Sequence, residues 1–145
     1  MFEVGKGVER VEVKMRHMEI KFENGKEVFG MSGPWLADCY LDNKKLQGKF
    51  LIDNAPFSID ESRIALSRYS DSPSYRRVFK IVVVDSMADI FYISKTDFNS
   101  LFIESVNSDS IVFYEAFHNK LPNRRRSILI SLDNFFQVMP NEIYF

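Results

Sequence analysis

Apolar residues recur at every second position along most of this chain, and that period constrains its fold more than any other feature. One such set would point to one side of an extended strand: Trp35, Ala37, Cys39 and Leu41. The segment Val78–Val84 is instead apolar at nearly every position, which is typical of a central strand covered on both faces. No segment carries an apolar stripe of period 3.6 over three turns. The sequence therefore predicts a mostly β protein.

Turn signals divide the alternating segments into hairpins. Asn24-Gly25 is typical of a two-residue hairpin loop, and the period then predicts that Ile20 lies opposite Phe29. Asp42-Asn43 predicts a second hairpin, with a returning strand over 46–52. A third hairpin signal is the run Asn107-Ser108-Asp109, between two strand-like segments.

The phase of the alternation changes near the N-terminus. Val13 and Met15 alternate in the opposite phase to Met18 and Ile20, so we expect a bulge or a break across Arg16 and His17. At 145 residues the chain has the length of one domain, 1–145. About nine or ten short strands fit an antiparallel β-sandwich or a partly open β-barrel. We expect at most one or two short helices, one of them capped by Ser94 or Thr96.

The charge balance argues against a nucleic-acid partner. Nineteen basic and twenty acidic residues leave a formal net charge of −1, and no part of the chain concentrates positive charge. Cys39 is the only cysteine, which excludes an internal disulfide and fits a reducing compartment. No apolar run resembles a signal peptide or a membrane span. We therefore expect a cytoplasmic protein with no membrane partner.

Catalytic, cofactor-binding and metal-binding sites are not expected. The two histidines, His17 and His118, lack the spacing and the acidic neighbours of a metal pair. Asp85 and Asp89 bracket a turn, where aspartate commonly accepts hydrogen bonds from nearby backbone. Cys39 lies in an alternating strand, where it is expected to pack in the core and not to act as a nucleophile.

Two loops combine tyrosine, proline and arginine just before an apolar strand, and they supply the candidate partner-binding residues. These candidates are Tyr69, Tyr75, Arg76, Arg77, Tyr114, His118, Arg124, Arg125 and Arg126. If both loops lay at one end of the sheet, their five arginines would form one basic patch. The competing interpretation is that the arginines are solvated, or paired with acidic side chains, and keep strand edges from pairing.

The stretch Ala55–Asn119 resembles the strand-rich body of bacterial immunity proteins of polymorphic and contact-dependent toxin systems. The resemblance lies in a D-x-x-x-I-A-L-x-R-Y element, a K-I-V-V-V-D strand and a later I-x-F-Y-E-A strand. It implies a non-enzymatic protein that binds and neutralises a cognate toxin, without cofactors. It transfers no contact residue, because contact residues differ among such proteins.

Three hypotheses follow. The first is the toxin-neutralising immunity protein, or another protein-binding module. The second is a single-stranded nucleic-acid binder that uses Tyr75, Tyr114 and the arginine loops. The third is a phosphate-ester enzyme that uses His118 as its acid or base, with arginines stabilising phosphate oxygens.

Overall fold

The computed structural model describes residues 11–15, 18–28, 34–52, 58–59, 62–71, 77–117 and 121–145. Its strands in chain order are β1 (Val11–Met15), β2 (Met18–Glu27), β3 (Trp35–Leu41), β4 (Lys44–Lys45), β5 (Lys49–Leu51), β6 (Ser58–Ile59), β7 (Arg63–Asp71), β8 (Arg77–Asp85), β9 (Ile90–Ser94), β10 (Phe102–Val106), β11 (Ser110–Tyr114), β12 (Arg125–Leu129) and β13 (Phe135–Val138). A 3-10 turn, η1 (Pro122–Arg124), precedes β12, and a four-residue helix, α1 (Pro140–Ile143), follows β13.

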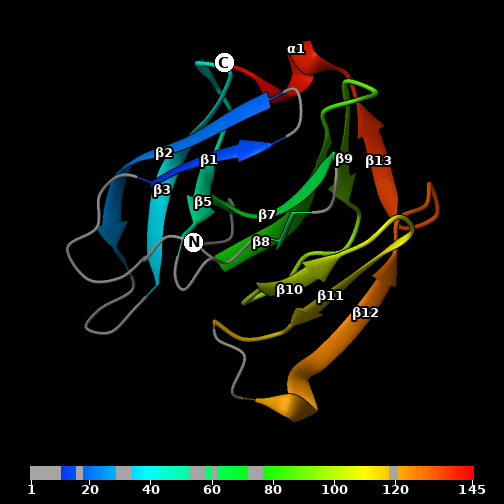
Figure 1. The fold of residues 1–145 in the computed structure, drawn as a ribbon. Helices are drawn as coiled ribbons and strands as arrows, with labels where there is room; N and C mark the ends of the chain where they lie inside the picture. The colour runs from blue at the N-terminus through cyan, green and yellow to red at the C-terminus, as the bar shows by residue number, and fades with distance from the viewer. Residues whose placement is uncertain are drawn as a thin grey trace.

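The strands form two antiparallel sheets (Figure 1). The larger sheet has ten strands, with the path β1-β2-β3-β5-β7-β8-β9-β13 and the short strands β4 and β6 attached to β3 and β7. The smaller sheet has the order β10-β11-β12. Within the described residues the strands do not close into a barrel. The predicted fold class, mostly antiparallel β with at most two short helices, is confirmed.

β8 is the central strand that its continuous apolar sequence predicts. It pairs with β7 on one side and with β9 on the other. Its alternate side chains contribute to two separate cores, because successive residues of a strand point to opposite faces. Val82 and Val84 belong to the first core, whereas Phe79, Ile81 and Val83 belong to the second.

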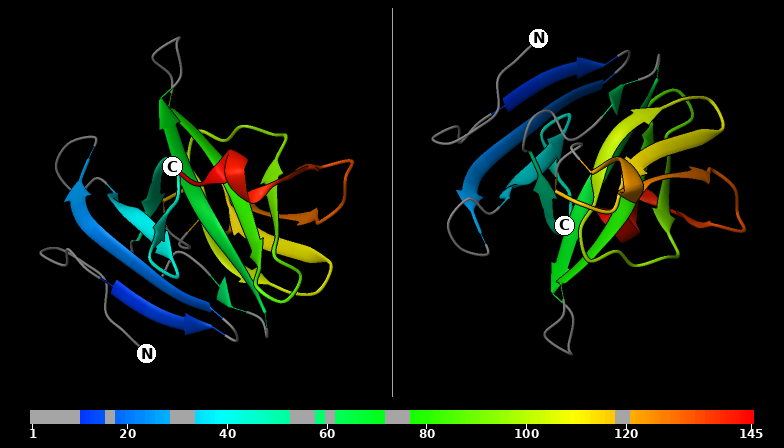
Figure 2. Two further views of the ribbon diagram at one scale, coloured as in Figure 1. Left: turned by 90° about the horizontal axis from the view of Figure 1, so that it is seen from above. Right: turned by 90° about the horizontal axis from the view of Figure 1, so that it is seen from below.

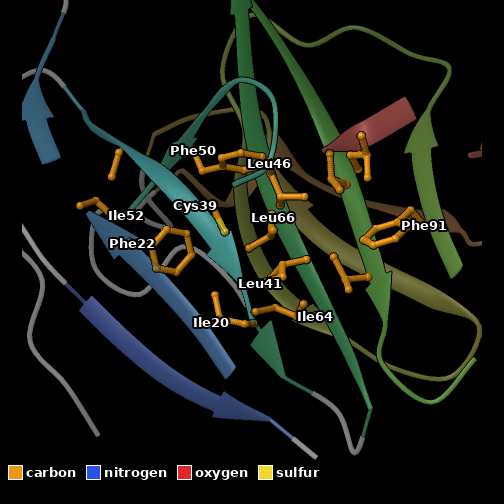
Figure 3. Packing of buried hydrophobic residues seen from close by; sticks show 14 residues of the cluster. Ile20, Phe22, Cys39, Leu41, Leu46, Phe50, Ile52, Ile64, Leu66 and Phe91 are labelled. Atoms are coloured by element: carbon orange, nitrogen blue, oxygen red, sulfur yellow. The ribbon is translucent and has the colours of Figure 1, made fainter. Parts of the chain in front are cut away.

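The first core fills the curve of the larger sheet. Figure 2 shows β2 and β3 facing β7 and β8 across it, and Figure 3 shows their side chains pointing toward one another. Ile143 of α1 is also buried in this core, and the neighbouring Tyr144 bridges to Leu46. Ile143 and Tyr144, near the end of the chain, therefore dock on the first core.

The second core lies between the larger and the smaller sheet. Figure 2 shows β11 on the far side of β7 and β8 from β2 and β3. The rings of Phe98 and Phe113 meet here with centroids 5.1 Å apart, and Phe79 contacts Phe117 at 5.3 Å. A guanidinium also ties the two sheets together, because Arg63 donates to the carbonyl of Ser108 and pairs with Asp85.

The predicted hairpin at Asn24-Gly25 is wrong. β2 runs through these two residues, and its partners are β1 and β3. Glu23 pairs with Asp38 and Lys26 with Leu36, so one extra residue of β2 is accommodated as a bulge. Asn24 has φ of 59°, and a positive φ at such a site serves a bulge as well as a turn. Phe29 lies outside the described residues.

The phase change near the N-terminus is a break between two paired strands. β1 and β2 are antiparallel, with Met15 opposite Met18 and Val13 opposite Ile20. An odd position of β1 therefore pairs with an even position of β2. Arg16 and His17 themselves lie outside the described residues.

The other predicted turns are confirmed. Asp42 and Asn43 both have positive φ, 47° and 66°, and join β3 to β4. Residues 107–109 join β10 to β11. The helical turn expected after Ser94 is absent from residues 95–100. Ser94 is buried instead, and its hydroxyl accepts from the Ile81 N–H and donates to the Thr96 carbonyl.

Candidate functional site: the outer face and free edge of the smaller sheet

Two of the predicted site residues meet on the outer face of the smaller sheet. Tyr114 and Arg125 are cross-strand partners, and the carboxylate of Glu104 joins them. The Tyr114 hydroxyl donates to Glu104 Oε1 at 2.9 Å, and Arg125 Nη2 donates to Glu104 Oε2 at 2.8 Å. Such charge-assisted hydrogen bonds fix the direction of the side chains.

A bulge in β10 positions Glu104. Ile103 pairs with Phe113 and Ser105 with Val112, so Glu104 is the extra residue of β10. The bulge keeps both Ile103 and Val106 on the second core, although they are three positions apart. Glu104 is left outside the core, beside Tyr114 and Arg125.

The three groups shift one another's pKa. The hydrogen bond from Arg125 is the main reason that the pKa of Glu104 lies below its usual value, with Tyr114 adding to the effect. The same carboxylate raises the pKa of the Tyr114 phenol and of the Arg125 guanidinium. Glu104 and Arg125 therefore remain a charged pair, and Tyr114 keeps its proton, at neutral pH.

The arginine triplet is mostly engaged within the protein. Arg125 pairs with Glu104, and Arg126 lies 3.6 Å from Glu115 Oε2. Arg126 Nη1 also donates to the carbonyls of Asn123 and Arg125, both at 3.0 Å. Arg124 is exposed and has no ion pair within the described part of the chain. One of the three guanidinium groups is therefore available to a partner.

β12 is an edge strand with unpaired backbone groups. The bonds from Glu115 N to Arg124 O and from Ile130 N to Asp109 O set the phase of its ladder with β11. Hydrogen-bonded pairs alternate in an antiparallel ladder, so Arg125, Ser127 and Leu129 direct their backbone groups away from β11.

Some of these outward groups are already satisfied. The Arg125 N–H donates to the Pro122 carbonyl, and the Leu129 carbonyl accepts from Asn134 Nδ2. Among the described residues, no partner reaches the N–H and C=O of Ser127 or the N–H of Leu129. The free edge is therefore a short one, centred on Ser127.

Exposed large apolar residues follow this edge along the chain. Four large residues between 129 and 139 are more than half exposed: Leu129, Leu132, Phe136 and Met139. β12 and β13 follow one another along one side of the molecule (Figure 1). β13 is the last strand of the larger sheet, so these residues lie on, between or just after the edge strands of the two sheets. Exposed large apolar side chains beside an open edge are typical of an interaction surface.

The remaining predicted residues are distributed as follows. Tyr69 lies on β7 of the larger sheet, with its ring 5.3 Å from that of Phe79. Arg77 begins β8, where its backbone pairs with Asp71. Tyr75, Arg76, His118 and the side chain of Arg77 lie outside the described residues, so the five-arginine patch stays a prediction.

A second polar site, which sequence reasoning missed, lies around Asp38 on the larger sheet. Asp38 is 4% exposed, pairs with Lys49 and Lys45, and accepts from Asn24 Nδ2 at 3.0 Å. Burial raises the pKa of this carboxyl, but the hydrogen bonds from Lys49 and Asn24 and the nearby lysine charges outweigh it and leave the pKa lowered. The sequence does contain a sign of this site, because Asp38 is a charged residue in the middle of the otherwise apolar strand "WLADCYL".

Cys39 and Asp85, for which we predict structural roles, have those roles in the structure. Cys39 is fully buried, and burial raises the pKa of its thiol. Asp85 Oδ1 accepts from the N–H groups of Met87 and Ala88, the turn role expected of it. Across the described ranges, no group of three His, Cys, Asp or Glu residues could hold a metal ion. In that part of the chain, no helix has the length and apolar character needed to cross a membrane.

Comparison of the chain with protein-family models, with curated proteins and with solved structures found no match.

Proposed function

We propose that this protein is a non-enzymatic protein-binding module that contacts its partner through the free edge of β12 and the apolar side chains next to it. The observation that carries the proposal is the combination of unpaired backbone groups at Ser127 and Leu129 with four exposed large side chains between residues 129 and 139. A partner strand could pair with this edge while its side chains cover Leu129.

The immunity-protein resemblance gives the partner its class. We propose a cytoplasmic immunity protein whose partner is the cognate toxin of an interbacterial toxin system. The pairing of Arg125 and Arg126 with Glu104 and Glu115 supports a protein partner over single-stranded nucleic acid, because paired guanidinium groups release fewer counterions on binding.

The test is co-purification with the product of the adjacent gene, followed by titration calorimetry. We expect a complex of defined stoichiometry, and we expect Leu129→Arg to weaken it by about tenfold or more. Ser127→Pro should weaken it too, since proline removes the outward N–H without removing a bond to β11.

Met87→Arg is the matched control. Met87 is a similarly exposed apolar residue in the turn between β8 and β9, beside the end of β13 that is farther from β12, so this variant should bind like the wild type. Loss of binding in Met87→Arg as well, or failure of the adjacent gene product to bind at all, would contradict the proposal. Salt-dependent binding of a single-stranded oligonucleotide would favour the nucleic-acid alternative instead.

A further inference from the structure

The larger sheet carries two adjoining hollows that are separate from the β12 edge. One has a volume of about 420 Å³ and the other of about 350 Å³, and they share the residues Asp38, Lys49 and Tyr69. These three occupy one cross-strand row on β3, β5 and β7, since Ala37 pairs with Phe50 and Lys49 pairs with Tyr69. The volumes fall in the range of small-molecule sites, about 300–1,000 Å³.

The charges that line the hollows are mainly positive. Lys26 lines the larger hollow, Lys45 lines the smaller, and Lys49 lines both. Asp38 is the one acidic residue among the lining side chains of these two hollows. Because it is buried beneath Lys45 and Lys49, it neutralises part of their charge and fixes their position. The Lys49 side chain is 53% exposed, so its ammonium can donate to a ligand as well.

The walls of the hollows are apolar and aromatic. Val28 and Leu36 line the larger hollow, Phe145 lines the smaller, and the Tyr69 ring lies between them. The Lys45 ammonium lies 4.9 Å from the centre of the Phe145 ring, a cation–π contact that holds both side chains at the rim. A flat ring could pack against Tyr69 while its acidic group reaches the lysines.

We infer that these hollows bind a small aromatic acid, a carboxylate or phosphate group carried on a ring. The lysines supply the charge that recognises the oxyanion, and the apolar walls supply the contact area for the ring. This site does not rest on the proposed function, because it uses other residues and another face of the molecule.

The test is a titration of the isotopically labelled protein with phenyl phosphate, followed by the amide NMR signals of Lys49 and Tyr69. Benzyl alcohol, which has the ring without the charge, and inorganic phosphate, which has the charge without the ring, are the comparison probes. We expect phenyl phosphate to bind at least about tenfold more tightly than either of them.

Charge reversal at Lys26 tests the site directly. Lys26 is exposed and makes no ion pair with any described residue, so Lys26→Glu should fold normally and weaken binding about tenfold. Lys44→Glu is the matched control, because Lys44 is exposed but faces the opposite side of the sheet, opposite Leu41. Equal losses in both variants, or no shift of the Lys49 and Tyr69 signals at about 10 mM phenyl phosphate, would overturn the inference.

Discussion

β8 and β12 look alike in the sequence and differ completely in the structure. Each has a proline shortly before it and consecutive arginines at its start, and these arginines lead into branched apolar residues. Yet Ile81, Val82 and Val83 of β8 are fully buried, whereas Leu129 of β12 is 60% exposed. β8 has a strand on each side and a core on each face, whereas β12 has one neighbour and one partly covered face. A strand's place in its sheet therefore decides what its apolar residues do.

The difference lies in how much each strand contributes to the stability of the fold. Apolar side chains on β8 stabilise the fold, because their burial removes them from water. On β12, Ile128 packs partly against the second core, whereas Leu129 is mostly exposed and should contribute little to folding.

The largest effect is expected at Phe79. Phe79→Ala deletes a fully buried ring that contacts Tyr69 and Phe117, and it should lower the free energy of unfolding by about 3–5 kcal/mol. Urea denaturation followed by circular dichroism measures the change. The paired variant Leu129→Ala should change the same quantity by less than about 0.5 kcal/mol. Comparable losses of unfolding free energy in the two variants would contradict the difference between β8 and β12.

An intermediate effect is expected at Asp38, where the larger sheet buries a charge. Asp38→Asn keeps the shape but removes the carboxylate that Lys49 and Lys45 contact, and we expect a loss of about 1–3 kcal/mol in the free energy of unfolding. Glu104→Gln on the smaller sheet should cost clearly less, since that pair is solvated. An equal or greater loss in Glu104→Gln would show that burial does not distinguish the two ion pairs.

The pH dependence sharpens the same contrast. The pKa of Asp38 is lowered in the folded protein, below its ordinary value of 3.8, so its contribution to stability is present above that pH and is lost as the pH falls below it. The wild type should therefore lose stability more steeply between about pH 4 and pH 2 than Asp38→Asn does. Thermal melts of both proteins across this range provide the measurement, and parallel pH profiles would contradict the role of Asp38.

The smallest effect on stability is expected for proline at the edge. Ser127→Pro removes an N–H that faces away from β11, so the melting temperature should stay nearly unchanged. Ile128→Pro, one residue further along, removes a bond of the ladder and should lower it clearly. Equal melting temperatures for the two variants would show that the Ser127 N–H does not point away from β11.

Parts of this fold follow from the sequence alone. The run Val78–Val84 has polar residues at so few positions that only a strand covered on both faces accommodates it, and β8 is such a strand. Asp42-Asn43 also predicts its turn, because both residues tolerate the positive φ that they adopt. Asn24-Gly25 misleads for a related reason, since a positive φ at Asn24 suits a bulge equally well. The choice there depends on β3, which is distant in the sequence.

The sites were harder to predict than the strands. Tyr114 and Arg125 could be named as candidates from their residue types, but their link through Glu104 depends on the bulge in β10. No local signal marks that extra residue. The hollow around Asp38 was missed because its lysines come from β2, β4 and β5, and only the pairing of these strands with β3 brings them together.

The double role of β8 has a consequence for how the molecule melts. Because alternate residues of one strand serve two cores, β8 cannot separate from the first core without also leaving the second. Neither core can then open as an independent unit, and heat should unfold both in a single cooperative transition. In calorimetry, the heat absorbed should equal the enthalpy obtained from the temperature dependence of the equilibrium.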